Sequence, residues 1–185
     1  MTLLQIAGGQ TWPNFLPILG YQPREVIFLT SADSDGAYAR SMEAMRTAAV
    51  SPAQPSPVEI RRTVTSGENP TLQECRDALG QLDPAGINMI NLTGGTKAMS
   101  LAAFLFAQEH GIPSFHLDTR RAAQPFDDCS TAPHPLPFPA LSDLSQRINV
   151  RTALQCHGFP VPSTFKQPAP SWVDFARNAA RIRLD

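Results

Sequence analysis

A short turn in the middle of the chain carries the residues best suited to chemistry. Thr93-Gly94-Gly95-Thr96-Lys97 places two glycines between two hydroxyls and ends on a cation. Glycine leaves backbone N–H groups bare, and the hydroxyls and the ammonium group add further hydrogen-bond donors. A cluster of donors of this kind suits an anion, above all a phosphate.

The segments on either side of the turn determine whether its donors lie at the end of a strand and the start of a helix. The short apolar run 87–92 favours a buried strand, whereas the largely apolar pattern from Lys97 is helical and ends at Gly111. The first N–H groups of a helix lack partners and carry a partial positive charge. The segment therefore predicts an anion site at a strand-to-helix corner. The P-loop spacing is not met, so a plain structural turn with a solvated Lys97 stays open as the alternative.

Composition narrows the class of protein. The chain has 185 residues, of which 42% are hydrophobic and 17% charged, and this favours one globular domain with at most a small appendage. A net charge of −1 argues against non-specific binding to long nucleic acid. No apolar run approaches membrane-spanning length, so we expect no membrane helix. Three widely spaced cysteines without a C-x-x-C pair argue against a zinc ribbon and, without a secretory signal, favour a reducing cytoplasm.

Strand and helix patterns alternate along the first two thirds of the chain. Strands are expected at 3–7, 25–30, 58–64, 87–92 and 114–119, and helices at 13–19, 37–49, 71–82 and 97–110. The segment 31–36 is expected to be a loop because it is rich in Ser, Asp and Gly. This alternation predicts an α/β fold: a Rossmann-like, doubly wound, mainly parallel sheet with helices on both faces.

In such a sheet, ligands bind beyond the carboxyl ends of the strands. Most of the predicted ends are rich in Gly, Ser or Thr, which favours a polar, phosphate-bearing ligand over an apolar one. The segments at these ends are 8–11, Ser31, Ser66-Gly67, 93–97 and Asp118-Thr119.

The last third of the chain changes in character. Residues 120–140 are proline-rich and predict an extended arm or irregular hairpin followed by a linker. Residues 141–157 predict a helix that Gly158 stops, and 159–170 form a second proline-rich linker. Residues 172–184 predict a short amphipathic helix, so the fold is expected to carry a proline-rich C-terminal extension.

Two motifs resemble a known family. Asn91-Leu92-Thr93-Gly94-Gly95-Thr96-Lys97-Ala98-Met99 resembles the strand-turn-helix motif of CRISPR-associated Rossmann-fold (CARF) sensor domains. The similarity is greatest to the branch fused to restriction-like nucleases in type III CRISPR ancillary effectors. Gly9-Gln10-Thr11-Trp12-Pro13-Asn14 is similar to the first ligand loop of that branch, and 141–158 resembles the segment after its sensor domain. The resemblance spans about residues 1–158.

This resemblance implies a homodimeric sensor that binds a cyclic oligoadenylate, with cyclic tetra-adenylate as the ring that best matches two-fold symmetry. It implies a CARF-like sensor domain over 1–140 and a helical linker with a C-terminal amphipathic helix over 141–185. The resemblance implies ligand-binding residues, but it implies no catalytic residue, no metal and no cofactor other than the cyclic ligand. Phosphate and ribose would lie on Thr93, Gly94, Gly95, Thr96 and Lys97; Gly9, Gln10, Thr11 and Asn14 would line the other side, Ser31, Ser66 and Gly67 the rim, and Asp118 and Thr119 the adenine or ribose edges.

The remaining sequence leaves the type of function open. About 27 residues follow Gly158 and hold no clustered nuclease residues, so we expect a sensor that acts alone or forms part of a longer protein with a fused or separate effector. The 159–185 tail would then act as a lever. The alternative is a metal-independent ring nuclease, in which a ribose 2′-hydroxyl attacks its own phosphodiester and Thr96 and Lys97 stabilise the charge. No histidine stands out as a general base. A dehydrogenase-like fold ranks last because the G-x-G-x-x-G fingerprint is absent.

Overall fold

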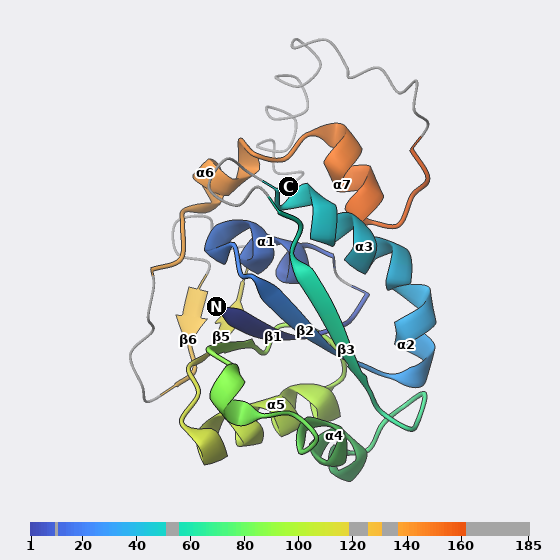
Figure 1. Cartoon of the computed structure of the whole chain (residues 1–185), viewed down its shortest axis with the longest axis vertical. Helices are drawn as coiled ribbons and strands as arrows, with labels where there is room; N and C mark the ends of the chain where they lie inside the picture. Colours follow the sequence, from blue (N-terminus) through green and yellow to red (C-terminus); the bar gives the residue numbers. More distant parts are fainter. Residues whose placement is uncertain (10, 51–55, 119–125, 131–136, 162–185) are drawn as a thin grey trace, which may run out of the picture.

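The computed structural model describes residues 1–9, 11–50, 56–118, 126–130 and 137–161 (Figure 1). Within these residues, six strands form one sheet in the order β3-β2-β1-β4-β5-β6. β1 to β5 run parallel, and β6 pairs antiparallel with β5. The strands are β1 (Thr2–Ile6), β2 (Glu25–Thr30), β3 (Glu59–Val64), β4 (Met89–Asn91), β5 (Ser114–Leu117) and β6 (Phe126–Asp128).

Helices cover both faces of the sheet (Figure 1). On one face, α1, α3, α6 and α7 contribute to an apolar cluster that includes Phe15, Phe28 and Met42; on the other, α4 and α5 pack over Leu4, Ile27 and Ile90. The predicted Rossmann-like α/β fold is thus confirmed. The helices are α1 (Trp12–Tyr21), α2 (Ala32–Ala37), α3 (Ala39–Ala48), α4 (Leu72–Leu79), the 3₁₀ turn η1 (Pro84–Gly86), α5 (Lys97–His110), α6 (Leu141–Ser145) and α7 (Val150–Cys156).

The central strands are apolar because both of their faces are covered. β1 and β2 are almost wholly buried, as expected of parallel strands between two helix layers. Leu4 of β1 lies opposite Ile27 of β2 on one side and Ile90 of β4 on the other. β3 is an edge strand, and its residues are largely exposed because only one of its long sides pairs with a neighbour.

Several predicted elements agree closely with the structure, two do not, and one strand was not predicted. The strand at 25–30 and the helix from Lys97 appear as predicted, and Gly111 ends α5 in the left-handed region. The predicted loop at 31–36 is wrong, because most of it forms α2. β6 was not predicted as a strand. The single helix predicted at 141–157 is wrong as well, since Asn149 caps a second helix there through a hydrogen bond from the Thr152 N–H (2.8 Å).

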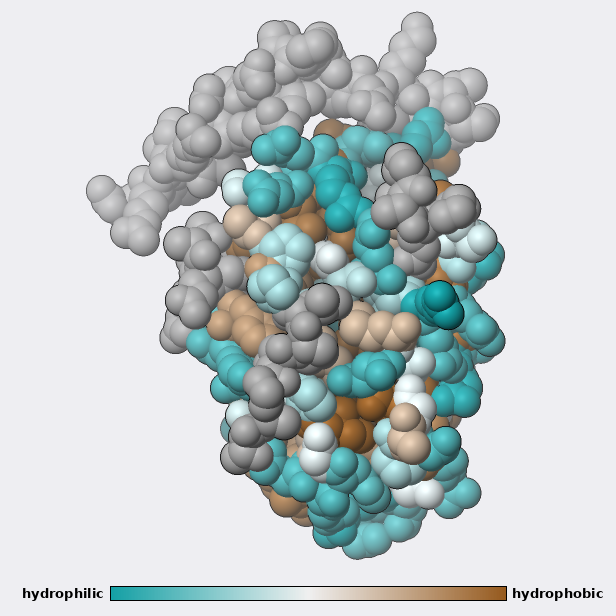
Figure 2. Space-filling model, turned by 60° about the vertical axis from the view of Figure 1, so that its left-hand side comes forward, coloured by the Kyte–Doolittle hydropathy of each residue, from teal (hydrophilic) through white to brown (hydrophobic). Residues whose placement is uncertain are grey.

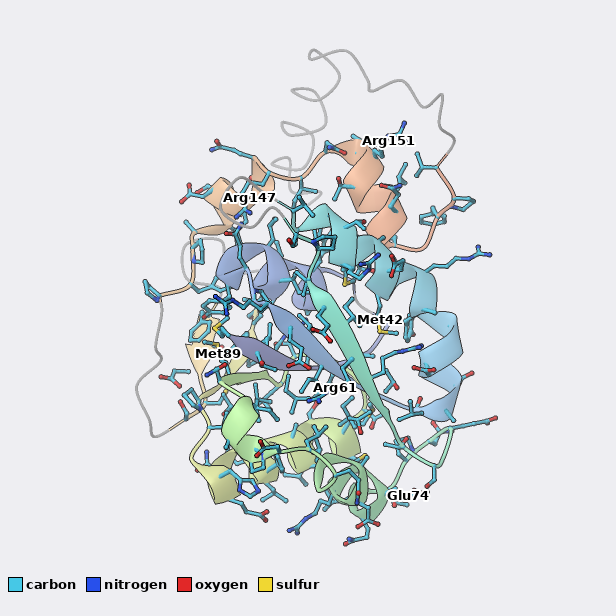
Figure 3. The ribbon with its side chains drawn as sticks, in the orientation of Figure 1. Met42, Arg61, Glu74, Met89, Arg147 and Arg151 are labelled. Carbon is cyan, nitrogen blue, oxygen red and sulfur yellow. The ribbon has the colours of Figure 1, made fainter. Side chains whose placement is uncertain are left out.

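The segment that contains α6 and α7 packs on the body of the domain. Leu144 and Cys156 are buried in the same apolar cluster as α1 and α3, and burial raises the pKa of the Cys156 thiol to about 12. Arg147, labelled in Figure 3 between α6 and α7, donates a hydrogen bond to the carbonyl oxygen of Leu19 in α1 (2.8 Å). The segment is therefore held by both apolar and polar contacts. The division into 1–140 and 141–185 stays a prediction, and the amphipathic helix expected at 172–184 lies outside the described residues.

The surface is mixed in character. Figure 2 shows hydrophilic residues over most of the coloured surface on one side of the molecule, with smaller apolar areas between them, one of which lies in its lower half. Exposed large apolar side chains in the described ranges include Val50, Val64, Leu101, Val150 and Phe159. No helix in the described part of the chain combines the length and the apolar character needed to cross a membrane.

Candidate ligand-binding site

The site lies at the point where the strand order reverses: β2 and β3 are added on one side of β1, and β4 and β5 on the other. β1 and β4 are neighbours in the sheet, yet α1 follows β1 onto one face and α5 follows β4 onto the other. In open parallel sheets, a crevice forms beyond the carboxyl ends of two such strands, and ligands bind there. The loop after β1 and the Thr-Gly-Gly-Thr turn after β4 both begin at this point. We call the described residues of the two segments together the central corner (7–9, 11–14 and 92–97).

A buried polar network fixes the two halves of the central corner relative to each other. Gln5 and Asn91 are fully buried in otherwise apolar strands. Asn91 Nδ2 donates to Gln5 Oε1 and to the Pro13 carbonyl, both at 2.8 Å, while Gln5 Nε2 donates to the Asn14 carbonyl at 3.1 Å. Asn91 Oδ1 accepts from the Thr93 N–H at 3.0 Å. The network therefore ties β1, β4 and the start of α1 together.

Gly94 and Gly95 are required because the two loops touch. A Cβ on Gly94 would collide with the Ile6 carbonyl oxygen, and one on Gly95 would collide with the Ile6 side chain. Gly95 also has a φ of +63°, a conformation that disfavours other residues. A Cβ on Gly8 would lie 2.5 Å from the Gly95 nitrogen. The glycines thus have a packing role in addition to the bare backbone that the sequence suggested for a ligand.

Hydrogen bonds within the turn leave its hydroxyl hydrogens available. Thr93 Oγ1 accepts from the Leu117 N–H at 2.6 Å, and Thr96 Oγ1 caps α5 by accepting from the Met99 N–H at 3.3 Å. Ser100 Oγ donates to the Gly94 carbonyl at 2.9 Å and holds the turn against the helix. Because Thr93 and Thr96 act as acceptors here, each keeps a hydrogen to donate. Lys97 is exposed at the first position of α5, so its ammonium group is accessible.

Asn14 faces the turn from the other side. It is 4% exposed, and its Oδ1 accepts no hydrogen bond from the rest of the described chain. This atom lies 3.7 Å from the position of a Cβ on Gly94. A buried polar atom without a partner is uncommon in folded proteins and calls for an explanation such as a ligand. The side chain that the sequence predicted to line the site is thus beside the turn.

Thr11, at the end of the β1 loop, contacts a residue that sequence reasoning missed. A hydrogen bond of 3.1 Å joins Thr11 Oγ1 and His157 Nδ1, and the His157 ring packs edge-on against Trp12. His157 follows α7 and is separated from Thr11 by 146 positions. No local sequence pattern marks a contact over that distance, and the sequence placed His157 only at the end of the helix predicted over 141–157.

The other predicted site residues lie farther along the carboxyl edge. Ser31 and Gly67 meet where the Ala32 N–H donates to the Gly67 carbonyl (3.3 Å), beyond β2 and β3. Ser66 Oγ donates to Glu74 Oε1 at 2.8 Å. Asp118 is half-buried just beyond β5. Gln10 and Thr119 lie outside the described residues, so their predicted roles stay predictions.

The Ser66–Glu74 contact belongs to the cap of α4. Thr71 donates to Glu74 Oε2 through both its N–H and its hydroxyl at 2.8 Å, and the Glu74 N–H donates back to Thr71 Oγ1 at 3.3 Å. The Thr71 N–H, then the Ser66 and Thr71 hydroxyls, lower the pKa of Glu74. We call the region of Ser31, Ser66, Gly67 and this cap the lateral corner.

No cluster suited to a metal is found in the described ranges, where no group of three or more His, Cys, Asp or Glu side chains could hold an ion. What the central corner offers is neutral and cationic hydrogen-bond donors: backbone N–H groups, two hydroxyls, an amide and Lys97. This is the chemistry of a site for a phosphorylated ligand.

Fold and corner together define a Rossmann-like domain whose candidate ligand site lies at the topological switch point. Residues 2–124 match the family profile of the Card1 CARF domain, and the match covers more than half of the 185 residues. The chain therefore belongs to the Card1 CARF domain family. The search of curated proteins found no match.

Solved structures share the fold. Can2 from Sulfobacillus thermosulfidooxidans, in complex with cyclic tetra-adenylate, aligns with a TM-score of 0.65 and 21% identity over 97% of this chain and 47% of that one. A type III CRISPR defence DNA nuclease activated by cyclic oligoadenylate gives a TM-score of 0.63 and 22% identity over 98% and 27%. The protein VC1899 from Vibrio cholerae gives 0.61 and 14% over 84% and 38%. The present chain thus spans less than half the length of each of these structures.

Proposed function

We propose that this chain is a homodimeric sensor of cyclic oligoadenylate, most specifically cyclic tetra-adenylate, in type III CRISPR antiviral signalling. Its membership of the Card1 CARF domain family supports the proposal. Two proteins of the same fold have such rings as ligand or activator: Can2 is in complex with cyclic tetra-adenylate, and a type III CRISPR defence DNA nuclease is activated by cyclic oligoadenylate. The observation that carries the proposal furthest is the central corner, where two loops bring phosphate-binding groups together at the switch point.

In this proposal, one phosphate of the ring lies on the Thr-Gly-Gly-Thr turn. The hydroxyl hydrogens of Thr93 and Thr96, the bare backbone of the turn and the Lys97 ammonium group supply the donors. A ribose hydroxyl of the ring donates to Asn14 Oδ1 and so supplies the partner that this buried oxygen otherwise lacks. The proposed contacts are Gly9, Gln10, Thr11, Asn14, Thr93, Gly94, Gly95, Thr96 and Lys97, with Ser31, Ser66 and Gly67 as rim and Asp118 and Thr119 at the base or ribose edges.

The second protomer is proposed because a ring with two-fold symmetry is matched by two identical surfaces related by the same axis. Leu101, which is 48% exposed, lies one helical turn after Lys97 on α5. An exposed leucine next to the proposed phosphate site suits an interface that continues from the ring. The signal would then pass to an effector, either fused or separate, in the cytoplasm.

Isothermal titration calorimetry with cyclic tetra-adenylate tests the proposal. We expect saturable binding at one ring per two chains, and a dimer by light scattering coupled to size-exclusion chromatography. Linear tetra-adenylate, which has the same bases and sugars, serves as the control and should bind at least tenfold more weakly because it is not pre-organised. An absence of heat with rings of four or six nucleotides would disprove the sensor proposal.

A second candidate function is a metal-independent ring nuclease, and one observation favours it. His157 brings an imidazole to the β1 loop through its hydrogen bond with Thr11, and imidazole is the commonest proton acceptor in catalysis. In this candidate, a ribose 2′-hydroxyl attacks the neighbouring phosphorus and gives its proton to a base. A 2′,3′-cyclic phosphate forms as the bond from phosphorus to the 5′-oxygen breaks, and the departing 5′-oxygen takes up a proton. Chromatography after prolonged incubation decides between the two: a ring recovered intact argues for sensing alone.

A further inference from the structure

A pocket of about 500 Å³ lies beside the β1 loop, and its lining residues do not include the Thr-Gly-Gly-Thr turn. Its size falls within the usual range for small-molecule sites. Three segments far apart in the sequence build it: the β1 loop, the junction between α2 and α3, and the end of α7. The residues on which the argument rests are Gly9, Thr11, Tyr38, Arg40, Ser41 and His157.

The walls of this pocket are fixed by specific contacts. Tyr38 stands at the N-terminal end of α3, and its hydroxyl lies 3.2 Å from the position of a Cβ on Gly9. The Thr11–His157 hydrogen bond joins the β1 loop to the end of α7, and both residues line the pocket. Gly158, with a φ of +79°, packs against Ser41 Oγ on α3. α7 is therefore one wall of the pocket.

The groups that line the pocket suit a purine base. Among the described residues, Arg40 forms no ion pair and the Tyr38 hydroxyl forms no hydrogen bond, so both are available. A phenol ring, an imidazole and a guanidinium group offer flat faces for stacking, and the hydroxyls of Thr11 and Ser41 can pair with the edge of a base. A phosphate would call for several convergent donors of positive charge, whereas Arg40 is the one permanently charged side chain among the lining residues.

The pocket is continuous with the central corner. Gly8 contacts Gly95 of the turn, while Gly9, the next residue, contacts Tyr38 of the pocket. Only the backbone of the β1 loop at Gly8 and Gly9 would therefore separate a phosphate on the turn from a base in the pocket. The phosphate and the base of one nucleotide can lie on opposite sides of a single backbone segment. A ring bound on the turn can therefore direct an adenine across the β1 loop.

We propose that this pocket is an adenine subsite for the ring, and that the end of α7 forms its wall. The inference rests on the proposed function and adds a specific location for one base. It also gives the ring a direct contact with the segment that leads out of the domain, because His157 and Gly158 directly follow α7. Occupancy of the pocket is then transmitted to α7 without a change in the sheet.

The test combines calorimetry with hydrogen–deuterium exchange on the whole chain. Arg40→Gln and Tyr38→Ala should each lower the affinity for cyclic tetra-adenylate about tenfold, in line with the loss of one stacking partner. Arg24→Gln is the matched control, because Arg24 is also exposed and carries the same charge but precedes β2 at the opposite end of the strand. Circular dichroism melts show that each variant is folded. The ring should slow exchange in 150–158 of the wild type and much less in Arg40→Gln.

The outcomes separate the two proposals. If the wild type does not bind cyclic tetra-adenylate, both the sensor function and the adenine subsite are disproved. If the wild type binds but Arg40→Gln and Tyr38→Ala bind equally well, only the subsite falls. Competition identifies the chemistry: adenosine at high concentration should weaken ring binding to the wild type and not to Tyr38→Ala. Weakening by inorganic phosphate, lost in Arg40→Gln, would instead show a phosphate in the pocket and overturn the adenine assignment.

Discussion

The central corner and the lateral corner both lie at the carboxyl edge of the sheet, and both are rich in Ser, Thr and Gly. In the lateral corner the hydroxyls of Thr30, Thr65 and Ser66 donate their hydrogens to Asp35, the Gly67 carbonyl and Glu74. In the central corner, Thr93 and Thr96 accept hydrogen bonds from backbone N–H groups instead.

This difference shows that residues of one type can stabilise a loop in one place and remain available to a ligand in another. A hydroxyl that donates to its own loop stabilises that loop, whereas one that accepts from the backbone retains a hydrogen for a ligand. The central corner also holds the buried Asn14 oxygen without a partner and the accessible Lys97. The account therefore predicts that the central corner determines binding and the lateral corner determines mainly local stability.

The largest effect is expected from Gly94→Ala. The added methyl group would collide with the backbone oxygen of Ile6, which cannot rotate away, so we expect a loss of about 3 kcal/mol in the free energy of unfolding. Urea denaturation measures it. Gly36→Ala, at an open position within α2, is the control and should leave stability unchanged or slightly raised. Equal stability of Gly94→Ala and wild type would show that the two loops are not in close contact.

Asn91→Leu should have the next largest effect. The substitution removes both donors from Gln5 Oε1 and the Pro13 carbonyl, and we expect a cost of about 2 kcal/mol from buried groups left unpaired. Thr63→Val, which removes a half-buried hydrogen bond to the Ala78 carbonyl on the lateral side, should cost less than about 1 kcal/mol. If urea denaturation gave the two variants the same cost, the polar network would not be what holds the central corner.

Lys97→Gln tests the comparison through binding. Loss of one charge-assisted hydrogen bond to phosphate should weaken cyclic tetra-adenylate binding about tenfold in calorimetry. Arg62→Gln removes a cation of the same charge from the lateral side, where Arg62 pairs with Asp35 at 3.1 Å, and should change the affinity less than about twofold. The reverse order of effects would move the phosphate site to the lateral corner.

The smallest effect concerns pH and the cap of α4. Because hydrogen bonds from Thr71 and Ser66 lower the pKa of Glu74 in the folded state, its carboxylate stabilises the fold above its ordinary pKa of 4.5. That contribution is lost as the pH falls below 4.5 and through the lower folded pKa. Glu74→Gln should therefore lower the melting temperature near neutral pH and lose this difference in acid, with ring affinity unchanged. Glu68→Gln, in the same loop, should match the wild type throughout, and a pH-independent deficit in Glu74→Gln would contradict the capping role.

The sequence predicted those features that local pattern determines. β2 is marked by a continuous apolar run, and α5 by the Thr96 cap and the Gly111 stop, so both boundaries followed from adjacent residues. α2 was missed because Ser31, Asp33 and Gly36 are typical of turns, although acidic residues also favour the first turn of a helix. β6 has only three residues and depends on antiparallel pairing with β5, which its own pattern does not reveal.

In the candidate site, too, features set by consecutive residues were predicted and features set by distant contacts were not. The Thr-Gly-Gly-Thr-Lys turn was readable because its residues are consecutive, and Gln5 and Asn91 were a visible signal as buried-strand amides that the sequence reasoning did not assign to a network. The contact of His157 with Thr11 depends on how α7 docks on α3, and no residue type near either position specifies it. Contacts made by tertiary packing thus required the structure.

A crystal structure of the chain with cyclic tetra-adenylate tests the central claim most directly. The account predicts one ring on the two-fold axis of a dimer, with a phosphate on the backbone of Gly94 and Gly95 and the Asn14 amide within hydrogen-bonding distance of the ring. A ring bound away from this turn, or a turn that keeps the same contacts while the ring lies on the lateral corner, would contradict it.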